Sequence, residues 1–317
     1  MEHIAKERFT RVGEDKKARE AISRPSMTFM QDAMHRFSKN RVALFCAIVV
    51  LGLVLVSVVA PMLSPFDYRE QHYGHINAAM LTMCDDASSA GMGHVHIFGT
   101  DTLGRDIFTR VWMGGRISLT IAFVSAIIDF FLGVLYGGIS GYFGGTTDII
   151  MMRILEIING IPYLIIVILL MMILPPGMIT IIIAYSMVGW IPMARLVRGQ
   201  VVSLKQQEFV AAAEALGASP SRVIVKHLLP NALSVVIVRV TLSIPAAIFS
   251  EAYLSYLGLG VQLPMCSWGS LAQAGIENFR VYPSQLMIPA ICISVAMLAF
   301  NMFGDGLRDA FDPRLRR

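Results

Sequence analysis

The sequence predicts an all-α membrane protein with six transmembrane helices. Of its 317 residues, 55% are hydrophobic and only 15% are charged, and the mean hydropathy is +0.63. A soluble domain carries about 25% charged residues. Several apolar runs reach about 18 residues or more, which is long enough to cross a bilayer. Backbone amides find no water partner in lipid, so each run is expected to be a helix.

The start of the chain is predicted to be a cytoplasmic tail, residues 1–41. Ten Lys or Arg residues lie between Lys6 and Arg41. Such a cluster directly before a first apolar run is typical of a segment that stays inside the cell. No apolar core follows the start closely enough for a cleaved signal peptide. The net charge of +4 gives no indication of a nucleic-acid partner.

The transmembrane domain is predicted to cover 42–304. Basic residues gather in the loops of one side, which places both termini and the coupling loop 200–232 in the cytoplasm. The main outer loop is then 63–117, and 305–317 is a cytoplasmic C-terminal tail. The expected spans are about 42–62, 118–140, 148–174, 178–199, 233–256 and 284–304.

Ionisable side chains inside the spans are the first candidate functional residues. Charge in a membrane is costly and usually faces a cavity or a partner. Asp129 and Glu251 are therefore candidates to line a pathway, and a neighbouring helix could equally satisfy Glu251. Glu156 lies one turn from Arg153, so a local pair is expected there.

Glycines recur every four residues through the end of the second expected span, at 133, 137, 141 and 145. A stripe of small residues lets a second helix approach closely. We expect tight helix packing along this stripe.

A polar, alanine-rich segment from Glu208 to Pro230 interrupts the apolar spans. Its first half, up to residue 216, has strong helix formers, and Gly217 suits the left-handed residue that ends a helix. Ser219 is predicted to cap a second helix with Pro220 at its first position. Pro230 is expected to end that helix before the fifth span. The alanine face is small enough to enter a groove on a partner.

The sequence lacks the common nucleotide-binding and catalytic motifs. No GxxxxGK[ST], HExxH or GxSxG occurs, so no enzyme is expected, and ATP hydrolysis would have to come from another chain.

Four histidines between His72 and His96 share the outer loop, without the helical spacing typical of a metal site. Cys84 and Cys266 fall in outer loops, where they could be free thiols or a disulfide; no metal ligand set is indicated.

The segment 208–230 resembles the coupling loop of ABC importer permeases. That loop reads Glu-Ala-Ala, three residues, Gly, nine residues, an aliphatic, any residue and then Leu-Pro. This sequence departs from it at Ala211, where the family has an acid, and at His227, where it has an aliphatic residue. The matching residues are Ala212, Ala213, Gly217, Leu229 and Pro230.

Further motifs resemble the oligopeptide, dipeptide and nickel permeases, most of all the C-type permease of an oligopeptide importer. The likeness runs from about residue 30 to the end of the chain. Its motifs are FGTDTLGRD at 98–106, SGYFGG at 140–145, YLGLGVQ at 256–262 with SWG at 267–269, and FNMFGDGLRDA at 300–310 with DPR at 312–314.

The resemblance implies a type I permease fold with cytoplasmic coupling helices, in a bacterial inner or plasma membrane. It implies a complex with a second permease, two ABC ATPases and an extracytoplasmic peptide-binding protein. ATP and Mg²⁺ would sit on the ATPases, with no cofactor on this chain. The residues implied in coupling are Ala211, Ala212, Ala213, Gly217, Ser219, Pro220, His227, Leu229 and Pro230.

Three charged residues of the outer motif have two readings. Asp101, Arg105 and Asp106 would form either a capped helix with local charge pairs or an outer gate and receptor contact. For the whole chain, dipeptides and nickel chelates are alternative cargoes. An ion-driven secondary carrier is the alternative that Asp129 and Glu251 favour.

Overall fold

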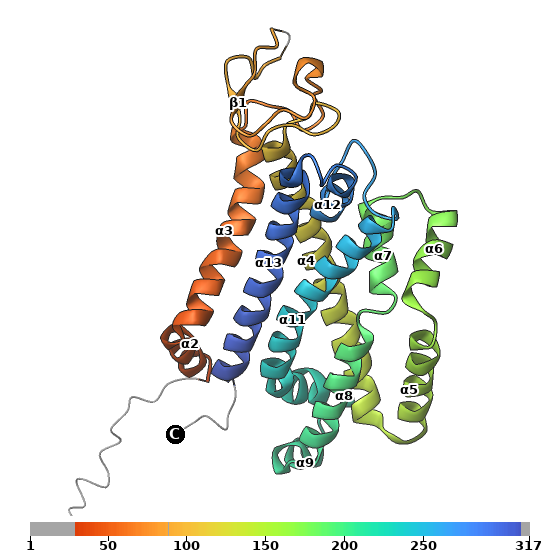
Figure 1. The fold of residues 1–317 in the computed structure, drawn as a ribbon. Helices are drawn as coiled ribbons and strands as arrows, with labels where there is room; N and C mark the ends of the chain where they lie inside the picture. The colour runs from red at the N-terminus through yellow and green to blue at the C-terminus, as the bar shows by residue number, and fades with distance from the viewer. Residues whose placement is uncertain (1–28, 88, 312–317) are drawn as a thin grey trace, which may run out of the picture.

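The computed structural model describes residues 29–87 and 89–311, and Figure 1 shows a bundle of long helices with a small irregular subdomain at one end. The elements are α2 (Phe29–Lys39), α3 (Arg41–Leu63), η2 (Tyr73–His75), β1 (Thr82–Met83), β2 (Val95–His96), α4 (Ile107–Phe143), α5 (Gly145–Asn159), α6 (Tyr163–Ile173), α7 (Met178–Ser186), α8 (Ile191–Lys205), α9 (Glu208–Ala215), α10 (Pro220–Arg222), η3 (Val223–Leu228), α11 (Leu229–Tyr256), α12 (Trp268–Ile276) and α13 (Pro283–Phe311).

Five stretches of the described chain are long and apolar enough to cross a membrane. They are α3, α4, the α7–α8 pair, the helix from α10 through α11, and α13. The pair α5–α6 adds a sixth if its two halves, bent by 76°, form one span. The break falls at Pro162, which has no backbone N–H to continue a helix. An all-α membrane fold is thus confirmed.

The helix α4 begins well before the expected second span. It starts at Ile107 and runs for 37 residues, whereas the sequence predicted outer loop as far as residue 117. The cause is Asp106, whose side chain accepts a hydrogen bond from the backbone N–H of Thr109 at 2.8 Å. A capping carboxylate satisfies an otherwise unpaired donor of the first turn.

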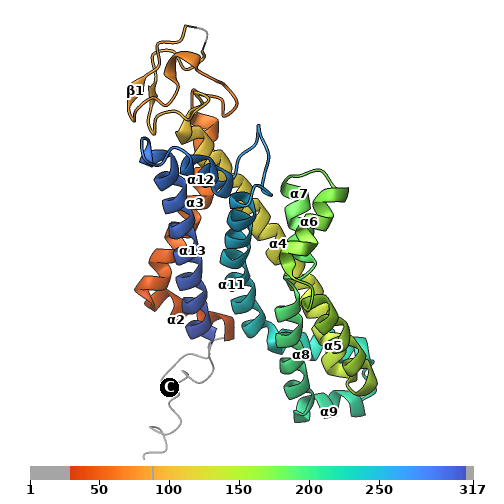
Figure 2. The ribbon, with the colours of Figure 1, turned by 45° about the vertical axis from the view of Figure 1, so that its right-hand side comes forward.

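The two ends of the bundle differ in structure. The segments 64–87 and 89–106, called the outer subdomain after the outer loop that the sequence predicts, hold the antiparallel pair β1–β2 with Thr82 opposite His96. Helices α2 and α9 and the end of α13 lie at the opposite end of the bundle, as Figures 1 and 2 show. Phe37 of α2 packs edge-on against Phe303 of α13, with ring centroids 5.6 Å apart. Both ends of the described chain are therefore on one side.

The glycine stripe of α4 packs directly against the backbone of α8. A Cβ atom on Gly137 would lie 2.3 Å from the carbonyl oxygen of Ala194, and one on Gly141 would lie 2.8 Å from that of Arg198. Gly145 meets nothing within 4 Å and is not part of the contact. The predicted close packing is confirmed for 133, 137 and 141, and it joins α4 to the helix that leads into α9.

Candidate functional site

The segment that the sequence singled out folds as the short helix α9, followed by a turn and by α10, which runs on through η3 into the long helix α11. Gly217 follows α9 with φ of +82°, a conformation that glycine adopts without steric cost. The N–H of Ala218 then bonds to the carbonyl of Ala213 at 3.1 Å, which satisfies a terminal carbonyl of α9. The predicted glycine stop is confirmed.

Two local predictions for the second helix are wrong. Ser219 precedes α10 but makes no side-chain capping hydrogen bond; its hydroxyl instead contacts that of Ser221 at 3.3 Å. Pro230 does not end the helix, because α10, η3 and α11 run on continuously. The turn η3 is π-helical. Pro230 follows η3 as the second residue of α11, so it lies inside the continuous helix.

The segment has a buried face and an exposed face. Val210, Val223 and Leu228 are at most 1% exposed and pack with side chains of α4, α8 and α11. On the other face Ala211 and Ala212 are exposed. We call residues 208–217, with this exposed alanine side, the α9 surface. His227 and Leu229 are half-buried and belong to the supporting side.

Phe209 and Leu216 extend the apolar part of the α9 surface. Their side chains are 41% and 89% exposed. An exposed apolar area outside the spans of a membrane protein is typical of an interaction site. The α9 surface therefore combines small residues with two larger apolar side chains at an accessible end of the bundle.

Polar contacts that the sequence did not indicate tie this end together. Arg198 of α8 donates two hydrogen bonds to Asp148 of α5, which also accepts from Ser140 of α4. Tyr142, within the SGYFGG motif, and Lys205, at the end of α8, join the same region. The motif position of Tyr142 was visible in the sequence, but its contacts with Lys205 and Glu214 join residues far apart along the chain.

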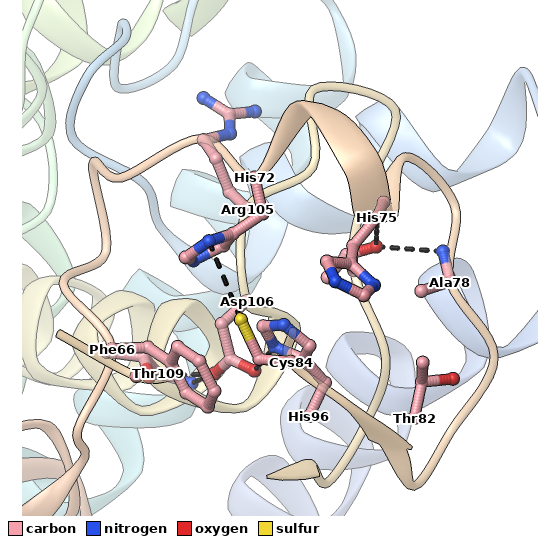
Figure 3. A network of polar contacts seen from close by, with 12 residues as sticks. Phe66, His72, His75, Ala78, Thr82, Cys84, His96, Arg105, Asp106 and Thr109 are labelled. Carbon is pink, nitrogen blue, oxygen red and sulfur yellow. Dashed lines mark hydrogen bonds and ion pairs between the residues drawn. The ribbon is translucent and has the colours of Figure 1, made fainter. Parts of the chain in front are cut away.

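Asp106 is central to the outer subdomain in Figure 3. One carboxylate oxygen caps α4 and also accepts from the Thr109 hydroxyl at 2.7 Å. The other contacts Nδ1 of His96 at 2.9 Å. Phe66 stacks on the His96 ring with centroids 4.2 Å apart. Both His96 and Asp106 are at most 1% exposed, so they form a packed junction between the subdomain and α4.

Asp101 and Arg105 form a local pair in the loop before α4. Nε of Arg105 donates to Asp101 at 2.8 Å, and Asp101 also accepts from backbone N–H groups of the same turn. Gln285 of α13 reaches this loop and donates to the carbonyl of Thr100 at 3.1 Å. The capped helix and the local charge pair are both present, and they fix the loop against α4 and α13.

Three of the four outer-loop histidines, His72, His75 and His96, lie together. The rings of His72 and His96 are 5.2 Å apart, and that of His75 is 5.7 Å from His96. Within residues 29–87 and 89–311, no group of three potential ligands is arranged to hold a metal ion.

The cysteines Cys84 and Cys266 are both free and buried. The thiol of Cys84 lies 4.0 Å from Nδ1 of His72, and that of Cys266 contacts the carbonyl of Arg110 at 3.3 Å. Burial raises the pKa of the Cys266 thiol.

The two buried carboxylates of the spans differ in their surroundings. Glu251 accepts hydrogen bonds from Ser118 at 2.9 Å and Ser255 at 2.7 Å, and thereby joins α4 to α11. Asp129 is 1% exposed, yet neither of its oxygens has a hydrogen-bond partner among the described residues. It lies beside Gly189, where the backbone breaks between α7 and α8. Glu156 pairs with Arg153 at 2.5 Å, as expected.

Residues 133–317 match the family described as the binding-protein-dependent transport system inner membrane component. The chain belongs to this family. Residues 28–79 also match the N-terminal TM domain of oligopeptide transport permease C. The chain is thus an ABC transporter permease, a multi-pass protein of the bacterial inner membrane.

Named relatives of this permease cover nearly its whole length. It is 46% identical to the oligopeptide transport system permease protein OppC of Bacillus subtilis (strain 168), over 100% of both chains. It is also 46% identical to the dipeptide transport system permease protein DppC of that organism, over 94% of this chain and 90% of the relative. A solved chain of the inward-facing MetNI methionine ABC transporter has a TM-score of 0.49 and 17% identity, covering 63% of this permease and 97% of that chain.

Proposed function

We propose that this permease forms half of the translocation pathway of an ATP-driven importer for oligopeptides. Support comes from the relative named for oligopeptide transport, which matches the full length of the chain. The equally similar relative named for dipeptide transport makes dipeptides the main alternative, and nickel chelates are a further one. The partners would be a second homologous permease, two ATPases that carry ATP and Mg²⁺, and an extracytoplasmic peptide-binding protein.

The α9 surface is the observation that carries the coupling part of the proposal. Its alanines are exposed while Val210 anchors the helix below them. A partner groove can close on alanines more deeply than on bulky side chains. Since Ala211 replaces the acid of the family motif, docking of an ATPase here would depend on shape. ATP binding would then drive alternating access by favouring one conformation of the assembly.

The orientation of the permease in the membrane is proposed from the end of the bundle that carries the α9 surface. Both ends of the described chain lie at the same end of the bundle as the α9 surface, and the basic residues before the first span favour the cytoplasmic side for this end. The outer subdomain would then face the receptor. We infer that Asp101, Arg105 and Asp106 set the shape of that receptor-facing loop.

Of the two buried carboxylates, Asp129 is the better candidate for the pathway. Its oxygens have no hydrogen-bond partner among the described residues, whereas those of Glu251 are engaged by serines. An ionisable side chain inside a membrane usually marks a functional position.

Reconstitution of the full complex in liposomes tests the proposed function. Ala212→Trp places bulk on the α9 surface and is expected to abolish both peptide uptake and receptor-stimulated ATP hydrolysis. Ala212→Ser is the matched control, because it changes the same exposed position without adding bulk. Normal uptake and normal stimulated hydrolysis in the Ala212 variant would contradict docking at this surface.

An ion-driven secondary carrier is the second candidate, favoured by the buried Asp129, whose oxygens have no hydrogen-bond partner among the described residues. It predicts uptake by this chain alone under a proton or sodium gradient. We expect liposomes that hold the permease without ATPases to show no uptake under either gradient. Uptake there would replace the ATP-driven proposal.

A further inference from the structure

The helix α9 has a direct polar contact to the end of α4. The hydroxyl of Tyr142 donates to Oε1 of Glu214 at 3.0 Å, across 72 positions of sequence. Tyr142 is the second-to-last residue of α4 and is only 9% exposed. Because its phenol is held in the apolar cluster below α9, its hydroxyl is a fixed donor rather than a mobile surface group.

Lys205 also contacts Tyr142. Its Nζ donates to the backbone carbonyl of Tyr142 at 2.7 Å and lies 5.0 Å from the centre of the tyrosine ring. A cation at this distance from an aromatic ring is attracted to it. Lys205 is the last residue of α8 and Glu214 belongs to α9, so the helices on both sides of the 206–207 link contact one residue of α4.

The other contacts of α9 do not fix its position as the bond from Tyr142 to Glu214 does. The helix has eight residues, which is too short to be stable in isolation. Its buried anchor is Val210, which contacts the bundle through an apolar and non-directional surface. Its other carboxylate, Glu208, makes no side-chain hydrogen bond within residues 29–87 and 89–311. The bond from Tyr142 is thus the directional contact that fixes α9 relative to α4.

We propose that Tyr142 is a positioning residue for transport, whose hydroxyl fastens the coupling helix α9 to α4 through Glu214. A displacement of α9 by a docked ATPase is then passed to α4 directly and to α8 through Lys205. The acid that Ala211 does not provide on the exposed side is present as Glu214, directed toward the permease itself. This inference rests on the proposed function.

Tyr142→Phe tests the contact, because it removes the hydroxyl and keeps the ring that packs against Lys205. The readout is the number of peptides imported per ATP hydrolysed by the reconstituted complex. We expect this ratio to fall about tenfold with ATP hydrolysis retained, since one hydrogen bond to a charged group shifts an equilibrium by that order. Glu214→Ala should behave alike, and the double variant should be no worse than either single one.

Tyr253→Phe is the matched control, because Tyr253 of α11 is 46% exposed and its hydroxyl makes no hydrogen bond within residues 29–87 and 89–311. It is expected to keep the wild-type ratio, and Glu214→Gln should retain part of it because the amide oxygen still accepts. A normal ratio in Tyr142→Phe with a defect in Glu214→Ala would mean that Glu214 contacts the ATPase instead, and would overturn the proposal. A Tyr142→Phe variant that loses uptake, ATP hydrolysis and assembly together would also overturn the proposal. If the wild-type complex imports no peptide with ATP, the proposed function fails rather than this contact.

Discussion

Arg198 and Asp148 form a two-point ion pair between α8 and α5. Nε and Nη2 of Arg198 each contact a different oxygen of Asp148 at 2.5 Å. The planar guanidinium suits such paired contacts, which a lysine cannot reproduce. Since Asp148 also bonds to Ser140 of α4, one carboxylate connects three helices at the end of the bundle that carries the α9 surface.

Arg198→Lys is therefore expected to destabilise this end although it keeps the charge. We expect a loss of about 1 kcal/mol in the free energy of unfolding, at the low end for such pairs because Arg198 is 37% exposed. Thermal unfolding of the complex in detergent measures the change. Arg153→Lys is the control, because its pair with Glu156 is 71% and 52% exposed and should contribute nothing measurable. Equal melting temperatures for both variants would contradict the role of the pair.

Gly137→Ala is expected to disrupt the packing of α4 on α8. The new Cβ would lie 2.3 Å from the carbonyl oxygen of Ala194, and backbone cannot move aside as a flexible side chain can. We expect a loss of about 1–3 kcal/mol from overpacking, seen as a lower melting temperature and a lower yield of assembled complex. Gly199→Ala, on α8 and with nothing within 4 Å of the new Cβ, should be neutral or stabilising. Wild-type stability of the Gly137 variant would refute the close contact.

Glu251→Ala is expected to be strongly destabilising, because Ser118 and Ser255 would lose their buried acceptor. Unsatisfied buried polar groups cost about 1–3 kcal/mol each. Glu251→Gln retains one acceptor oxygen and should cost less. The same unfolding measurement compares the two variants, and an alanine variant as stable as the glutamine variant would show that the serine contacts contribute nothing.

For Asp129 we expect stability and transport to change in opposite directions. Asp129→Asn removes a carboxylate that has no hydrogen-bond partner in the described chain, so the melting temperature should stay equal or rise. Peptide uptake should fall if the residue serves the pathway. Uptake assays and thermal unfolding on one preparation decide the matter, and unchanged uptake would remove Asp129 from the pathway.

The thiol of Cys266 is expected to resist alkylation in the folded permease. Its burial excludes reagent, and its raised pKa keeps the unreactive protonated form up to a higher pH than in the unfolded chain. Mass spectrometry after maleimide labelling at pH 8 should find Cys266 unlabelled in the native protein and labelled after denaturation. A non-reduced peptide joining Cys84 to Cys266 would contradict the free thiols.

Much of the fold was predictable because the spans are long and apolar, and hydropathy alone places them. The start of α4 was placed too late. A capped helix at Asp106 was one of two readings of the outer motif, and the contact with Thr109 that decides between them is seen only in the structure. The continuous helix through Pro230 was missed because a π-turn has no pattern that the sequence displays.

The site was predictable only where it is local. Gly217 could be assigned from its neighbours, and the glycine stripe from its spacing. The bonds from Arg198 to Asp148 and from Tyr142 to Glu214 join residues 50 and 72 positions apart, and no periodicity encodes them. Likewise Asp129 and Glu251 look alike in sequence, and only the serines around Glu251 separate them.

The length of α4 has a thermodynamic consequence. Its 37 residues extend about 55 Å at 1.5 Å per residue, whereas the hydrocarbon core of a bilayer is about 30 Å thick. One helix thus belongs both to the outer subdomain, through Asp106, and to the α9 surface, through Tyr142. If ATP alters the affinity of the assembly for its receptor through this helix, then receptor binding alters the affinity for ATP by the same factor.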